Sequence, residues 1–211
     1  FPGTRWFPGA KLNFAENLLR YRDDQVAFAF KGETRPTVFM TYRELYRTVG
    51  RLAGALKASG VRMGDRVVGY MPNMMETAIG MLAATSLGAT WASCGSELGR
   101  QAVIDRFSQI NPKVLITVDG YLYKAKAFNM IDDVAEVAEA VPSLEKVVVV
   151  PYAGEHPSID KIPKSVLYGD FLASTQEEEP LFEQVPSDHP VYIMFSSGTT
   201  GKPKCMVQST G

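Results

Sequence analysis

The stretch from residue 196 to residue 204 concentrates groups that can bind phosphate. It reads Ser-Ser-Gly-Thr-Thr-Gly-Lys-Pro-Lys, so hydroxyls, glycines and lysines all fall within nine residues. Glycine lets the backbone adopt conformations that point several amides at one place. Hydroxyls add hydrogen-bond donors, and lysine adds a full positive charge. The combination predicts a loop that holds a polyphosphate, with Ser196, Ser197, Gly198, Thr199, Thr200, Gly201 and Lys204 as its binding residues.

The flanking sequence favours a structured loop over a flexible Ser/Gly linker, because apolar runs enter and leave it. It differs from a Walker loop, which requires Gly-x-x-x-x-Gly-Lys-Ser/Thr opening a helix. Here Gly198 and Gly201 are three residues apart, and Pro203 stands where the magnesium-binding hydroxyl would follow Lys202. A P-loop phosphotransferase, which would release ADP, therefore stays a weaker alternative.

The elements that position this loop follow an α/β pattern. Apolar strands without clean alternation are separated by helical stretches, which predicts a mostly parallel sheet flanked by helices. We expect strands at 26–30, 38–40, 66–70, 89–93, 114–118, 146–150 and 191–195, and helices at 41–60, 76–87, 97–110 and 131–141. The first helix opens with a capping box, Thr41 and Glu44, and presents basic side chains that we assign to a solvated face. Residues 153–187, rich in Pro, Ser and acid, are expected to be a connecting surface segment.

Composition excludes several classes of protein. Of 211 residues, 22 are Lys or Arg and 23 are Asp or Glu, a balance that argues against nucleic-acid or membrane coating. The uncharged stretch 77–96 has the length of a membrane span, but its glycines and hydroxyls fit a buried helix, a break at Gly88 and a buried strand better. Two distant cysteines and two histidines make a zinc site improbable and fit a reducing, cytoplasmic compartment. Both histidines, His156 and His189, lack a catalytic partner in the sequence and are expected to be structural or exposed.

The loop resembles the signature of the acyl-adenylate-forming superfamily, which includes acyl-CoA synthetases, luciferases and adenylation domains of peptide synthetases. Their pattern is roughly Ser/Thr-Ser-Gly-Ser/Thr-Thr-Gly-x-Pro-Lys-Gly, and residues 196–204 match it at each informative position. The departure is Cys205, where the family usually has glycine. The resemblance implies that this chain is the N-terminal part of the adenylate-forming large domain.

Other segments resemble one branch of this superfamily. Residues 6–17 are similar to the N-terminal arm of the acetyl-CoA and acetoacetyl-CoA synthetases, and segments 69–73, 105–113 and 146–152 are closer to the acetoacetyl-CoA synthetases. Acetyl-CoA synthetases typically carry a Gly-Gly-Phe-Ser segment near residue 96, where this chain has Cys-Gly-Ser-Glu-Leu-Gly. The resemblance predicts an arm over residues 1–40 and a partial AMP-binding (adenylation) domain over 41–211. Alternatives are an acetyl- or propionyl-CoA synthetase and a noncatalytic nucleotide-binding module.

The resemblance implies ATP, Mg²⁺, acetoacetate and CoA as ligands. Family members join a carboxylate to ATP, giving acyl-AMP and pyrophosphate, and then pass the acyl group to CoA. The resemblance also implies that the hydroxyls and glycine amides of the loop hold the β- and γ-phosphates of ATP. It further implies that Lys204 is the fixed cation and that Lys202 faces solvent. No catalytic residue is expected here, because the family's adenylation lysine and later motifs are absent from the sequence. We therefore expect this chain to be an N-terminal portion of an enzyme and to be inactive alone. Self-association through an unpaired sheet edge is a further option.

A second candidate site comprises Lys124 and Lys126, which follow the strand expected at 114–118. Related acetyl-CoA synthetases place arginines near here against the 3′-phosphate of CoA. The resemblance thus implies that these lysines bind the CoA phosphate, although Tyr123 stands where one arginine is expected. The alternative is a pair of solvated lysines.

Overall fold

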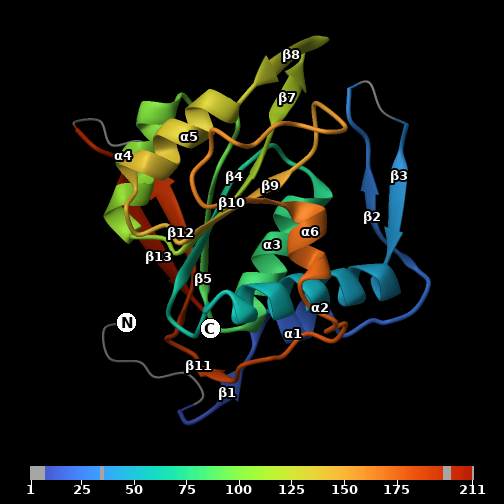
Figure 1. The fold of residues 1–211 in the computed structure, drawn as a ribbon. Helices are drawn as coiled ribbons and strands as arrows, with labels where there is room; N and C mark the ends of the chain where they lie inside the picture. Colours follow the sequence, from blue (N-terminus) through green and yellow to red (C-terminus); the bar gives the residue numbers. More distant parts are fainter. Residues whose placement is uncertain (1–7, 34–35, 197–200, 211) are drawn as a thin grey trace.

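A seven-stranded sheet forms the centre of the computed structural model, which describes residues 8–33, 36–196 and 201–210. The strand order is β10-β9-β6-β4-β5-β12-β13 (Figure 1). Neighbouring strands run parallel throughout except for β13, which is antiparallel to β12. The strands are β4 (Arg66–Tyr70), β5 (Thr90–Cys94), β6 (Val114–Val118), β9 (Lys146–Val150), β10 (Ser165–Leu167), β12 (Pro190–Ser196) and β13 (Lys204–Ser209).

Helices cover both faces of this sheet, as Figure 1 shows. Helices α4 and α5 pack together on one face, while α1, α2, α3 and α6 cover the other. Every residue of β6 is buried as a result, which explains why the strand is apolar without alternation. The helices are α1 (Phe14–Leu18), α2 (Tyr42–Ala58), α3 (Met75–Ser86), α4 (Arg100–Ile110), α5 (Ile131–Ala140) and α6 (Tyr168–Ala173). The predicted α/β architecture is confirmed.

Helix α2 begins with the predicted capping box. The Thr41 hydroxyl accepts the Glu44 backbone N–H at 3.2 Å, and the Glu44 carboxylate accepts the Thr41 N–H at 2.7 Å. The Thr41 N–H and the Thr41 hydroxyl, which both donate to the Glu44 carboxylate, hold the pKa of Glu44 below its ordinary value. The basic face of the helix is exposed, as predicted, and Arg51 there pairs with Glu178 at 2.9 Å.

The stretch 77–96 is confirmed as a buried helix, a break and a buried strand. It comprises most of α3, then Gly88 with a φ of +68°, then β5. A positive φ of this size is readily adopted by glycine and ends the helix. No helix among the described residues is long and apolar enough to cross a membrane.

The expectation that residues 153–187 form only a connecting surface segment is wrong. They contribute β10, which pairs in parallel with β9 at the edge of the sheet, then α6 and the two-residue strand β11 (Val185–Pro186). Their acidic part also packs tightly on α2. A Cβ placed on Gly50 would lie 2.4 Å from the carbonyl oxygen of Glu178, so only glycine allows this approach.

Three small antiparallel pairs surround the main sheet. Strand β1 (Lys11–Leu12) pairs with β11, β2 (Val26–Phe30) pairs with β3 (Val38–Thr41), and β7 (Gly120–Tyr123) pairs with β8 (Lys126–Asn129). The β7–β8 hairpin was not expected from the sequence. It follows β6 directly and therefore lies at the carboxyl edge of the sheet.

Candidate functional site

The candidate phosphate loop begins and ends at the carboxyl edge of the parallel strands. Ser196 is the last residue of β12 and lies directly opposite Lys204, the first residue of β13. Because β12 runs parallel to β5, both residues lie at the edge where ligands bind in sheets of this kind. Gly201, on the returning side, has a φ of +101°, a conformation that favours glycine. Of the predicted phosphate ligands, Ser197, Gly198, Thr199 and Thr200 lie outside the described residues.

Helix α4 contacts the residues on both sides of Lys204. The Gln109 side-chain amide donates to the Pro203 carbonyl at 3.1 Å, and the Cys205 thiol donates to the Gln109 side-chain oxygen, with sulfur and oxygen 3.7 Å apart. A glycine at position 205 could not make the second contact. Cys205, the departure from the family pattern, therefore adds an attachment between β13 and α4.

The strand order changes direction beside β4. The chain passes from β4 to β5 on one side and then to β6 on the other, which makes the carboxyl end of β4 the switch point. Tyr70 ends β4 and donates its hydroxyl to the Leu98 carbonyl at 2.6 Å. Burial raises the pKa of Tyr70, so its hydroxyl stays protonated at neutral pH.

Cys94, at the end of β5, is buried, and burial raises the pKa of its thiol to about 12. Cys94 is therefore a neutral thiol at neutral pH. A neutral thiol is a poor nucleophile.

Lys124 and Lys126 lie at the tip of the β7–β8 hairpin. Lys124 is the first residue of its two-residue turn, and Lys126 begins β8 opposite Tyr123. The structure does not bring them close to Lys204, because β4 and β5 separate β6 from β12, a spacing of about 14 Å at ordinary strand distances. The two candidate binding sites are thus separate regions along the same edge.

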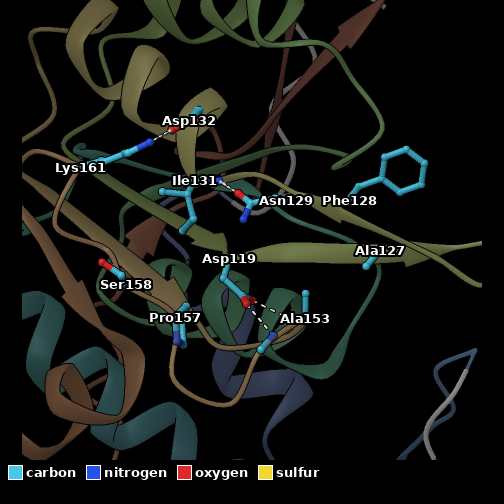
Figure 2. Close-up of a pocket in the computed structure, with 11 residues that line it drawn as sticks. Asp119, Ala127, Phe128, Asn129, Ile131, Asp132, Ala153, Pro157, Ser158 and Lys161 are labelled. Atoms are coloured by element: carbon cyan, nitrogen blue, oxygen red, sulfur yellow. Dashed lines mark hydrogen bonds and ion pairs between the residues drawn. The ribbon is translucent and has the colours of Figure 1, made fainter.

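A cavity of about 550 Å³ lies beside this hairpin (Figure 2). Its walls come from β8, the start of α5 and the loop after β9, and the Asp132–Lys161 ion pair, at 2.8 Å, lies on one side. Asp119 follows β6 and is buried at the base of the loop wall. Its carboxylate accepts three backbone N–H bonds, from Tyr152, Ala153 and Gly154, at 2.6, 2.9 and 2.7 Å. None of the described phosphate-loop residues lines this cavity.

The histidines are placed as predicted. His156 is exposed, and His189 lies with its Nε2 atom 2.8 Å from the Gly88 carbonyl oxygen, a structural contact. Within residues 8–33, 36–196 and 201–210, no group of three or more His, Cys, Asp or Glu residues could hold a metal ion.

Comparison with known proteins assigns the family. The model of the AMP-binding enzyme family matches residues 14–211. The chain belongs to the AMP-binding enzyme family. The matched residues include all seven strands of the central sheet, the phosphate loop and the β7–β8 hairpin.

Individual members of the AMP-binding enzyme family are similar over the whole chain. The acetoacetyl-CoA synthetase of Gallus gallus is 46% identical over 98% of this chain, and the acetoacetyl-coenzyme A synthetase of Rhizobium meliloti (strain 1021) is 46% identical over 99%. The solved structure of acetoacetyl-CoA synthetase from Streptomyces lividans superposes with a TM-score of 0.92 at 42% identity and covers 100% of this chain. This chain spans 32% of the length of each of these relatives.

Proposed function

We propose that this chain provides the phosphate-binding part of an acyl-CoA ligase that activates acetoacetate. In the proposed reaction, an acetoacetate oxygen attacks the α-phosphorus of ATP, pyrophosphate leaves, and the acyl group passes from acyl-AMP to the sulfur of CoA, releasing AMP. The observation that carries this proposal is the similarity to proteins named acetoacetyl-CoA synthetase over 98% or more of the chain.

The loop geometry supports this chemistry. Both reactants are anions, so the protein must offset charge and hold the leaving phosphates in line. Ser196 and Lys204 face each other across the mouth of a loop in which residues 197–201 are all hydroxyl residues or glycines. We assign the loop hydroxyls and amides to the β- and γ-phosphates and the Lys204 ammonium to their charge.

The donor set also indicates where magnesium belongs. Hydroxyls, amides and lysine suit phosphate oxygens, and Mg²⁺ in nucleotide sites is usually held by substrate phosphates, waters and only one or two carboxylates. We therefore assign Mg²⁺ to the ATP phosphates, where it would neutralise charge on the leaving group. The protein's own part is to bind and orient those phosphates.

The acyl specificity is tested by ATP–pyrophosphate exchange in the full-length protein with acetoacetate, acetate and propionate. Exchange requires adenylate formation and its reversal, so it reports the first half-reaction without CoA. We expect acetoacetate to give the highest exchange rate, by tenfold or more in kcat/KM. A preference for acetate or propionate would replace the substrate assignment. ATP binding without exchange for any acid would instead indicate a noncatalytic nucleotide-binding module.

We further propose that Lys124 and Lys126 bind the 3′-phosphate of CoA. Both belong to the exposed hairpin at the carboxyl edge, where a phosphate can reach them. Lys126→Glu should raise the KM for CoA by tenfold or more, because it replaces attraction by repulsion. The exposed Lys57→Glu on α2 is the charge-matched control and should leave this KM unchanged. An unchanged KM for CoA in the Lys126 variant would remove this assignment.

Cytoplasmic location and self-association are also proposals. The location is supported by the free thiols of Cys94 and Cys205. Self-association is supported by β13, which borders the sheet in the described part of the chain and exposes Met206 and Val207.

A further inference from the structure

The turn between β7 and β8 has an unfavourable backbone conformation. Lys124 and Ala125 have φ values of +51° and +58°, in the left-handed region. A Cβ atom makes this region unfavourable, and two-residue hairpin turns of this type usually use Asn and Gly. Because neither residue here is Asn or Gly, a contact from outside the hairpin must stabilise the turn.

Glu33 makes that contact. It lies in the connection between β2 and β3, which belong to a different sheet. One carboxylate oxygen accepts the N–H of Lys124 at 2.9 Å, and the other accepts the N–H of Ala125 at 2.8 Å. Two charge-assisted bonds to consecutive amides fix the orientation of both peptide planes. The same bonds hold the pKa of Glu33 below its ordinary value, so the carboxylate is ionised at neutral pH.

The conformation of this turn determines on which face of the hairpin the Lys126 side chain lies. The register places Lys126 opposite Tyr123, and a hairpin's register is set by its turn. A slip of one residue would move the Lys126 side chain to the other face of the hairpin. The conformation at 124–125 therefore controls where the lysine charges are presented.

We propose that Glu33 is a positioning residue for CoA, which holds the Lys124–Ala125 turn so that Lys124 and Lys126 face the CoA phosphate. This inference rests on the proposed CoA contact of the hairpin. Glu33 binds the backbone amides of the turn, so its effect on CoA passes through the lysines. The proposal thus gives Glu33, which is distant in sequence from the lysines, a role in CoA binding.

Kinetics of the full-length protein test this role. Glu33→Ala should raise the KM for CoA about tenfold, because the turn loses both acceptors. ATP–pyrophosphate exchange, which does not use CoA, should be unchanged. Glu33→Gln keeps one carbonyl acceptor and should give a smaller rise. The exposed Glu139→Ala on α5 is the matched truncation and should leave both measurements unchanged.

A second variant tests the mechanism directly. Glycine adopts the left-handed region without a Cβ penalty. Adding Ala125→Gly to Glu33→Ala should therefore restore most of the CoA affinity. A purely local structural defect at Glu33 would not be rescued in this way, and absence of rescue would overturn the proposal.

Hydrogen exchange separates the remaining outcomes. Glu33→Ala should speed exchange of the Lys124 and Ala125 amides, and unchanged exchange would overturn the structural step. Suppose that hydrogen exchange of the two amides becomes faster in Glu33→Ala, and that Lys126→Glu weakens CoA binding but Glu33→Ala does not. The positioning role alone is then wrong. If hydrogen exchange becomes faster and neither variant changes the KM for CoA, the proposed CoA contact of the hairpin is wrong, and so is the positioning role that depends on it.

Discussion

Lys204→Ala should slow adenylate formation by well over tenfold in the full-length protein, a loss above about 1.4 kcal/mol in transition-state stabilisation. Lys204 is exposed at the carboxyl edge, opposite Ser196 across the loop mouth, so its ammonium is available to a phosphate. The charge on the leaving pyrophosphate grows as the bond to the α-phosphorus breaks, and a fixed cation stabilises it most at that stage. The rate of ATP–pyrophosphate exchange with acetoacetate measures the effect.

Lys202→Ala is the matched control for this variant. Lys202 is also exposed and lies two residues away in the same loop, so the substitution removes the same charge from nearly the same place. We expect its exchange rate to stay within about twofold of the wild type, because the family signature leaves this position variable. Equal effects of the two substitutions would indicate a general contribution of positive charge, and an unaffected Lys204 variant would contradict the assigned role. Lys204→Arg keeps the charge with a different donor geometry and should recover only part of the rate.

The central strands were predictable because burial on both faces leaves a strong signal. Strands β4, β6 and β9 match the expected ranges, since helices on both sides require continuous apolar residues there. The apolar runs on either side of the phosphate loop were also recognisable in the sequence, and they form β12 and β13. Helix α4 begins at Arg100 rather than at the expected residue 97, because a turn from Gly95 to Leu98 precedes it.

The β7–β8 hairpin was missed because its turn lacks a local signal. Lys124 and Ala125 have no intrinsic preference for left-handed conformations, and the stabilising carboxylate is 91 residues away from Lys124 in the sequence. Strand β10 was missed because three residues are too few for a periodic pattern. The cavity in Figure 2 could not be expected either, since its walls come from segments that meet only in the folded chain.

Asp119→Ala should destabilise the chain by about 3 kcal/mol, because it leaves three backbone N–H groups at the base of the cavity without their acceptor. Asp119 is only 5% exposed, so water replaces the lost carboxylate poorly. The N–H groups belong to residues 152–154, which begin the loop wall of the cavity, and their three bonds fix the path of the chain after β9. Urea unfolding of the variant and the wild type measures the difference in the free energy of unfolding.

Two further substitutions show whether the loss comes from the buried acceptor. Asp132→Ala removes a carboxylate that lines the same cavity, but its ion pair with Lys161 is largely exposed, with side-chain exposures of 76% and 71%. Such a pair contributes little, so this variant should change the free energy of unfolding by no more than about 0.5 kcal/mol. Asp119→Asn keeps one carbonyl acceptor and should lie between the two alanine variants. If Asp119→Ala were no less stable than Asp132→Ala, the three amides would have other acceptors, and the loop after β9 would owe its position to packing alone.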